Sequence, residues 1–204
     1  MTIKDAKRNF ITDVAMRLFF ERSISDATVR DIAKVAGVGE ATVYRYFEHK
    51  RKIVMAVAEN LQRKVYAEYF RPRRDGNGYS KIRAFYENYV GVLTNSPEFY
   101  KFVSEFDAYM VSEGSVSSET YSLGVGLFKN VFFAAYKEGL KDGSVRELDD
   151  PETFYFSTAH AMLELGKKLS TAGKIVKQDE TTDKVAEMNA LKDVVLFYIA
   201  KPRA

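Results

Sequence analysis

The chain has 204 residues, of which 46% are hydrophobic, and it contains four prolines and no cysteine. The lack of cysteine excludes thiol catalysis, thiolate metal sites and disulfides, and it fits a reducing cytosol. The net charge is only +3, but residues 1–53 hold 11 Lys and Arg against 7 Asp and Glu. This excess favours an anionic partner for the N-terminal region, although a solvated helical face accounts for it equally well.

Two short helices joined by a tight turn are predicted between residues 28 and 47, after a first helix over about residues 4–22. Thr28 can cap the first of the pair, and Asp31 three positions later completes an approximate capping box. Gly37 can adopt positive φ and so end that helix sharply. Apolar residues recur at helical spacing and form one buried stripe: Val29, Ile32, Ala33 and Ala36.

The second short helix, residues 40–47, is unusually polar. Only Val43 and Phe47, four positions apart, need to face inward. Hydroxyl groups and a guanidinium on the remaining surface can donate to phosphate oxygens and to base edges, as the second helix of a helix-turn-helix does in the major groove. The outward set is Glu40, Thr42, Tyr44, Arg45 and Tyr46.

The stretch from Thr28 to Lys50 follows the pattern T-x-x-x-I-A-x-x-A-G-V-x-x-x-T-x-Y-x-Y-F-x-x-K and resembles the DNA-binding segment of the tetracycline-repressor (TetR) family. The similarity extends upstream to Ile11, Ala15, Leu18 and Phe19 and covers about the first quarter of the chain. It departs from the family pattern at Ser23 and Glu40. The resemblance implies DNA contacts at Thr28, Arg30, Thr42, Tyr44, Arg45, Tyr46 and Lys50, and Glu40 and Ala41 complete the candidate DNA-binding residues.

Glu40 has two opposite interpretations that the sequence leaves open. An acidic side chain at the start of a helix suits the helix dipole and can accept a hydrogen bond from cytosine N4. The same carboxylate would repel a phosphate.

A long helix from about His49 to Arg71 is predicted to connect an N-terminal DNA-binding domain, residues 1–53, to a helical domain of residues 54–204. The helix-breaking residues Pro72, Gly76 and Gly78 in the segment 71–79 end this helix. Further helices are predicted over 80–94, 97–112, 118–141, 151–171 and 182–200, with prolines opening two of them. No period-two strand pattern occurs, so the predicted fold is all-α, with about nine helices.

Aromatic residues dominate the larger part of the chain, because 22 of the 28 Phe and Tyr residues follow residue 53. Rings at helical spacing usually form ordinary core, but they also line apolar ligand sites. The TetR resemblance implies a small effector bound in this domain, and a lining of rings and hydroxyls suits a largely apolar molecule. The candidate lining is Tyr86, Tyr89, Phe102, Phe106, Tyr109, Phe128, Phe132, Tyr136 and His160.

The last two predicted helices carry a seam with small residues, which is typical of close helix packing. On pattern alone this seam completes the core of one chain or forms a dimer interface. The family resemblance favours a dimer, and a two-fold dimer can place two recognition helices in successive major grooves of a palindrome. The candidate interface is Thr158, Ala159, Met162, Leu165, Gly166, Leu169, Met188, Leu191, Val195 and Tyr198.

Catalysis has little support in the sequence. His49 and His160 are the only histidines, and no phosphate-binding loop, G-x-S-x-G or H-E-x-x-H motif occurs. The acidic residues between 147 and 152 suit a helix N-terminus better than a cation site, so no metal and no cofactor are expected.

The predicted function is that of a dimeric, cytoplasmic transcriptional regulator, most simply a repressor that a small effector releases from its operator. The alternative is an architectural or division-associated DNA-binding protein without a small-molecule switch.

Overall fold

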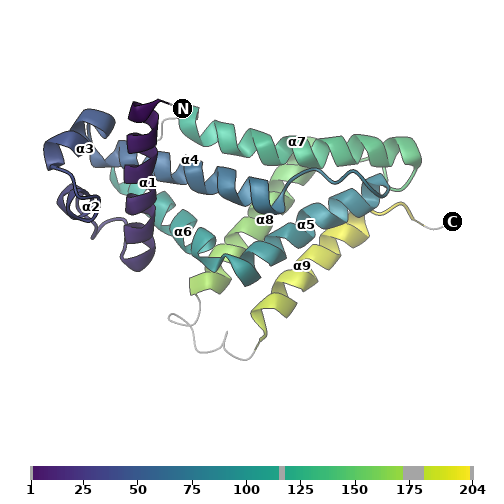
Figure 1. Cartoon of the computed structure of the whole chain (residues 1–204). Coiled ribbons are helices and arrows are strands. Elements are labelled where there is room, and N and C mark those ends of the chain that lie inside the picture. The colour runs from purple at the N-terminus through teal and green to yellow at the C-terminus, as the bar shows by residue number, and fades with distance from the viewer. Residues whose placement is uncertain (1, 115–117, 172–181, 203–204) are drawn as a thin grey trace. The chain divides into compact units, whose positions relative to one another are not determined.

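The computed structural model describes residues 2–114, 118–171 and 182–202, with the backbone alone described over 118–125. Its described part confirms the all-α prediction and contains nine helices (Figure 1). The only β-type pairing within these residues is an isolated bridge between Val145 and Ala200. The helices are α1 (Ile3–Glu21), α2 (Val29–Val35), α3 (Glu40–Phe47), α4 (Lys50–Tyr69), α5 (Gly78–Asn95), α6 (Pro97–Ser112), α7 (Ser118–Asp142), α8 (Pro151–Thr171) and α9 (Lys184–Ile199).

The helix ends agree closely with the predicted ones. Pro97 and Pro151 open α6 and α8, where the missing proline N–H would have no helical partner. Helix α4 begins at Lys50 rather than His49, because a tight turn at Glu48 and His49 separates it from α3. The predicted loop between the helices 151–171 and 182–200 lies outside the described residues.

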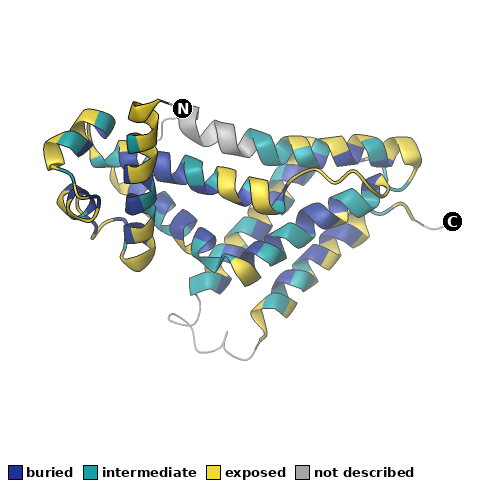
Figure 2. Ribbon diagram, in the orientation of Figure 1, coloured by how far each residue is buried: buried dark blue, intermediate teal, exposed yellow. Residues whose placement is uncertain are grey.

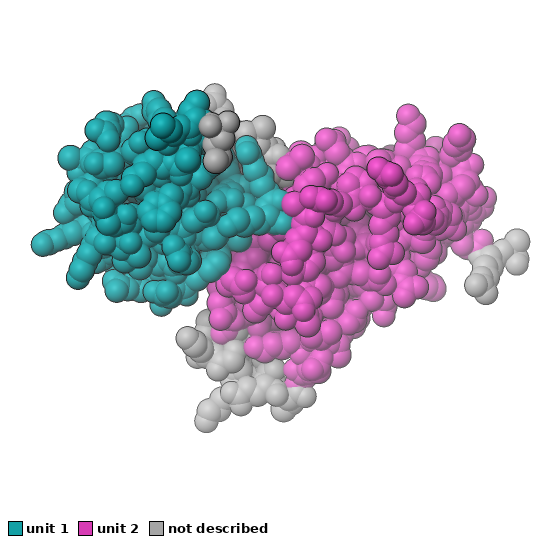
Figure 3. All heavy atoms as spheres, in the orientation of Figure 1, with its two compact units in different colours: residues 1–64, 102–122 teal, residues 65–101, 123–204 magenta. Residues whose placement is uncertain are grey.

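The chain forms two compact units (Figure 3). Unit 1 consists of residues 1–64 and 102–122, and unit 2 consists of residues 65–101 and 123–204. Helices α4, α6 and α7 each contribute residues to both units. The predicted boundary between the DNA-binding domain and the helical domain, at residue 53, does not coincide with a boundary of these packing units. It stays a prediction about function.

The core of unit 1 is built by the inward faces of its helices (Figure 2). Ile11 of α1, Ile32 of α2 and Phe47 of α3 are almost completely buried. The stretch that begins at residue 102 joins this unit through Glu105, whose carboxylate accepts a 2.8 Å hydrogen bond from the Ile24 N–H. Burial raises the pKa of the Glu105 carboxyl. The DNA-binding motif is therefore held by contacts from two distant parts of the chain.

In unit 2, helices α5, α8 and α9 pack against one another around an aromatic core. At the start of α5, Gly78 lies against α7 so closely that a Cβ on it would overlap the backbone of Gly139. The Gly78 N–H donates to the Asp142 carboxylate at 2.7 Å, which fixes this crossing. Only a residue without a side chain fits here.

Part of the predicted dimer seam lies inside unit 2. Met162 and Met188 are fully buried within the single chain, and the space above Gly166 is filled by the ring of Tyr100. The small residues of α8 thus admit a neighbouring helix of the same chain, and these positions are corrected from interface to core. The buried members of the seam are Ala159, Met162, Gly166, Leu169, Met188 and Val195, and the partly or fully exposed ones are Thr158, Leu165, Leu191 and Tyr198.

The acidic residues around position 150 act at the start of α8. Asp150 accepts hydrogen bonds from the backbone N–H and the hydroxyl of Thr153, at 3.0 and 2.6 Å. Glu152 pairs with Lys129 at 2.6 Å. The hydrogen bonds from Thr153 lower the pKa of the Asp150 carboxyl. The described residues hold no cluster of three or more side chains that suits a metal ion.

Candidate nucleic-acid interface

Helix α2 begins with the predicted capping box. The Thr28 hydroxyl accepts from the Asp31 N–H at 3.1 Å, and the Asp31 carboxylate accepts from both the hydroxyl and the N–H of Thr28. These bonds lower the pKa of the Asp31 carboxyl. Since its polar groups are committed to the cap, Thr28 serves first to start α2.

The turn between α2 and α3 depends on Gly37. Its φ is +63°, in the region that side chains disfavour, and the Val38 N–H returns to the Ala33 carbonyl at 3.0 Å. Helix α3 then starts at Glu40 without a side-chain cap. The chain turns sharply between α2 and α3, as the sequence predicted.

Helix α3 turns its apolar residues inward and its polar residues outward. Val43 and Phe47 are at most 1% exposed, whereas Tyr44 is 46% exposed. Ala41 and Arg45 are also exposed, and Thr42 and Tyr46 are half-buried. The Arg45 guanidinium lies 5.8 Å from the centre of the Tyr46 ring, which orients it while its N–H groups stay available.

Glu40 lies beside another candidate residue. Its carboxylate is 4.0 Å from the guanidinium of Arg30 on α2, and both side chains are well exposed. An exposed pair at this distance adds little to stability. It does place a positive group next to the carboxylate, and this lessens the repulsion that Glu40 would exert on a phosphate.

The predicted DNA contact Lys50 is half-buried and makes contacts within unit 1. Its ammonium donates to the Ser25 carbonyl at 3.1 Å and lies 5.5 Å from the centre of the Tyr109 ring. Burial lowers the pKa of the Lys50 ammonium, while the carboxylates of Glu113 and Asp26 act in the opposite direction. We infer that Lys50 stabilises unit 1, because its charge already faces internal partners.

We expect Lys50→Met to lower the thermal midpoint by about 2–4 °C, the equivalent of one lost hydrogen bond in a chain of this size. The salt dependence of DNA affinity should not change. Lys52→Met, which removes only an exposed pair with Glu48, is the control for the loss of charge. If Lys50 instead neutralises a phosphate, the negative slope of log affinity against log salt becomes shallower by ~0.9 in Lys50→Met. That result would contradict the assignment of Lys50 to the stability of unit 1.

Glu48, between α3 and α4, has a φ of +61°, and it is the only described residue other than glycine with positive φ. Such a conformation is strained for a side chain with a Cβ. The tight turn, closed by a 2.6 Å bond from the His49 N–H to the Phe47 carbonyl, sets the direction in which α4 leaves the recognition helix.

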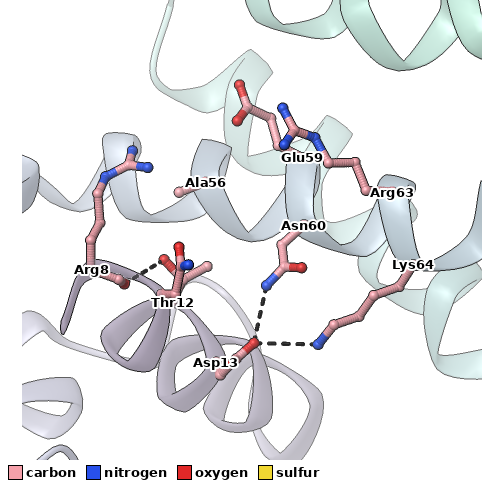
Figure 4. A pocket seen from close by; sticks show the side chains of 9 residues that line it. Arg8, Thr12, Asp13, Ala56, Glu59, Asn60, Arg63 and Lys64 are labelled. Atoms are coloured by element: carbon pink, nitrogen blue, oxygen red, sulfur yellow. Dashed lines mark hydrogen bonds and ion pairs between the residues drawn. The ribbon is translucent and has the colours of Figure 1, made fainter. Parts of the chain in front are cut away.

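A polar groove of about 300 Å³ lies between α1 and α4 within unit 1 (Figure 4). Asp13 accepts hydrogen bonds from Asn60 at 3.0 Å and from Lys64 at 3.3 Å, so its carboxylate links the two helices. Buried Thr12 is satisfied by the Arg8 carbonyl at 3.0 Å. The groove is a polar helix crossing and does not match the predicted aromatic pocket.

The predicted effector-lining residues fall into both units. Phe102, Phe106 and Tyr109 belong to unit 1, and the other six belong to unit 2. In unit 2 the Phe132 ring lies 6.2 Å from that of Tyr86 and 6.1 Å from that of Tyr136.

His160 lies on the exposed face of α8 beside Phe156. Its prediction as a ligand contact is therefore corrected, because its helical phase turns it toward solvent.

Three rings outside the predicted lining complete the aromatic cluster of unit 2. Phe85 and Tyr155 lie 6.2 Å apart, and Phe70 lies 5.4 Å from Phe85. Phe70 is beyond the last residue of α4 and Tyr155 is in the first turns of α8, so no single helical stripe connects them. Their meeting depends on tertiary packing.

Residues 11–57 match the family model described as bacterial regulatory proteins of the tetR family. Among curated proteins, the chain is 32% identical over 66 residues to the transcriptional repressor KstR2 of Rhodococcus jostii, and 32% identical over 66 residues to the nucleoid occlusion factor SlmA of Mannheimia succiniciproducens. Each match spans 32% of this chain and about a third of the relative, 32% for KstR2 and 31% for SlmA.

The whole chain resembles solved structures in fold. A Rhodococcus protein described as a TetR-family transcriptional regulator aligns with a TM-score of 0.73 at 15% identity, over 94% of this chain and 99% of that one. At this identity the similarity shows the fold alone. Within the described residues, no helix is long and apolar enough to cross a membrane.

Proposed function

We propose that this chain, whose residues 11–57 match the tetR family model, is a transcriptional regulator of that family and represses transcription as a dimer on a palindromic operator. A small, largely apolar effector releases it. The exposed polar face of α3 carries this proposal, since Arg45 and Tyr44 extend from a helix whose other side is locked into unit 1 by Val43 and Phe47. A rigidly held helix with free donors is what base readout requires.

A dimer is favoured by α9. Val194, Phe197 and Tyr198 lie three and four positions apart, hence on one helical face, and are 67%, 84% and 52% exposed. Covering such a patch with a second copy removes apolar surface from water. One short helix reads few base pairs, whereas a two-fold pair separated by ~34 Å reads both halves of a palindrome.

Effector control requires a link between unit 2 and the DNA-binding motif. Helix α4 begins three residues after α3 ends and continues without a break from unit 1 into unit 2. An effector that binds more tightly to a geometry unable to bind DNA shifts the population toward it. A preference of a few kcal/mol is enough to empty the operator.

Arg45→Ala tests direct reading of DNA. The operator is first selected from a random duplex library, and failure to enrich any sequence would contradict the proposed function. We expect the variant to bind the operator about 10- to 100-fold more weakly, the worth of one base contact, with a much smaller loss on unrelated DNA. Arg17→Ala on the exposed part of α1 controls for charge. Equal losses on both DNAs would make Arg45 a phosphate contact.

A second candidate function comes from the similarity to SlmA, a nucleoid occlusion factor. A protein of that kind needs the DNA-binding face without a small-molecule switch. The two functions differ in genome-wide occupancy: a repressor occupies a few promoters and leaves them when its effector is supplied. Many sites away from promoters, occupied under all conditions, would favour the second function.

A further inference from the structure

Four tyrosines gather in the core of unit 2: Tyr86, Tyr89, Tyr100 and Tyr155. Two have clear hydrogen-bond partners. The Tyr86 hydroxyl lies 2.6 Å from the Thr158 hydroxyl, and the Tyr100 hydroxyl donates to the Tyr89 carbonyl at 2.8 Å. These two phenols are ordinary members of a satisfied core.

The hydroxyls of Tyr89 and Tyr155 make no hydrogen bond with any residue that the structure describes, although the residues are only 9% and 3% exposed. Neither oxygen is among the completely sealed polar atoms without a partner, so each keeps some surface that a water-sized molecule can reach. A hydroxyl without a protein partner in a core is unfavourable, and such groups in a native protein call for an explanation.

The surroundings of these two residues are mostly aromatic. Tyr89 contacts Phe70 at 5.2 Å and Phe85 at 5.6 Å between ring centres, and Tyr155 contacts Phe132 at 5.2 Å. Burial raises the pKa of Tyr89 well above its usual value and that of Tyr155 to about 12. Both groups therefore remain neutral O–H donors. The Lys129 ammonium lies over the rings of Phe133 and Phe156 beside Tyr155, but it is already paired with Glu152 at 2.6 Å.

We propose that the Tyr89 and Tyr155 hydroxyls are the polar contacts of the effector site, and that they select a neutral molecule with an apolar body and a hydrogen-bond acceptor such as a ketone or ester carbonyl. This inference rests on the proposed function, because it specifies the chemistry of the effector. The aromatic rings bind the apolar body, and each phenol donates to an acceptor that no protein group supplies. A carboxylate is disfavoured, since its charge would be buried without a partner.

The first experiment compares two tyrosines of the free protein. Tyr89→Phe removes an unpaired hydroxyl, and we expect an unchanged or higher thermal midpoint. Tyr100→Phe removes a satisfied hydroxyl, and we expect the midpoint to fall by about 2–4 °C. If Tyr89→Phe lowers the midpoint as much as Tyr100→Phe does, its hydroxyl is satisfied within the folded core, and the proposal is overturned.

The second experiment uses two probes of the same shape: acetophenone, and 2-phenylpropene, in which a methylene replaces the carbonyl oxygen. Affinities are measured by NMR titration for the wild-type chain, Tyr89→Phe, Tyr155→Phe and the control Tyr100→Phe. We expect Tyr89→Phe or Tyr155→Phe to weaken acetophenone at least fivefold and to leave 2-phenylpropene unchanged, whereas the control keeps the wild-type ratio of the two affinities. Equal effects on both probes, or no saturable binding of either probe, would overturn the inference.

Release of operator DNA by acetophenone is measured separately. If the probes behave as expected but operator affinity does not change, the two hydroxyls bind the ligand as proposed and the regulatory function fails. If another small molecule releases the operator without depending on Tyr89 or Tyr155, the regulatory function holds and the inference fails.

Discussion

Phe197→Asp should convert a dimer into monomers and lower operator affinity by at least about a hundredfold. The side chain is 84% exposed at the centre of the apolar face of α9, so a carboxylate there hardly disturbs the single chain but would be buried without a partner in a dimer. A monomer also loses the gain that comes from binding both operator halves at once. Sedimentation measures the first effect, and DNA titration at low protein concentration measures the second.

The control for Phe197→Asp is Val111→Asp, because Val111 is an apolar residue that is 75% exposed on another helix, α6. It should change neither the oligomeric state nor the thermal midpoint. A dimer that persists in Phe197→Asp would show that α9 does not form the interface. Ala159→Arg is a poorer test, since Ala159 is only 6% exposed and its replacement would disrupt the core itself.

Gly166→Ala should destabilise the chain by about 1–3 kcal/mol, although alanine is the better helix former. A Cβ on Gly166 would overlap the ring of Tyr100. That ring is 1% exposed and is anchored by its bond to the Tyr89 carbonyl, so it has little room to move. Thermal or urea unfolding measures the change.

Gly126→Ala is the matched control, because this glycine also lies within a long helix, α7, and no atom of the described residues would lie within 4 Å of its Cβ. Here the helix propensity acts alone, and we expect a gain of up to about 1 kcal/mol. The same substitution should thus have opposite signs at two helical positions. A gain at both positions would show that Tyr100 moves aside easily.

Features that depend on neighbours in the chain were predictable from the sequence. The capping box of Thr28 and Asp31, the positive φ of Gly37 and the inward pair Val43 and Phe47 all follow from spacing over a few residues, and the structure confirms each of them. The all-α fold follows in the same way from helical periodicity and its breakers.

Features that depend on contacts across the chain were not predictable in this way. Lys50 has the residue type and position of a phosphate contact, yet it bonds to the Ser25 carbonyl and lies over the ring of Tyr109, a residue 59 positions later. Gly166 fits a dimer seam by pattern, but Tyr100 of the same chain occupies the space above it.

The sequence by itself therefore determined the helices and the polar face of α3, because a helix places its side chains by a local repeat. Only the tertiary structure decided which apolar residues of α8 and α9 are core and which remain on the surface. It also decided which tyrosines have partners. The burial of these apolar residues and the partners of the tyrosines both depend on which side chains from distant segments are in contact, and helical spacing does not specify those contacts.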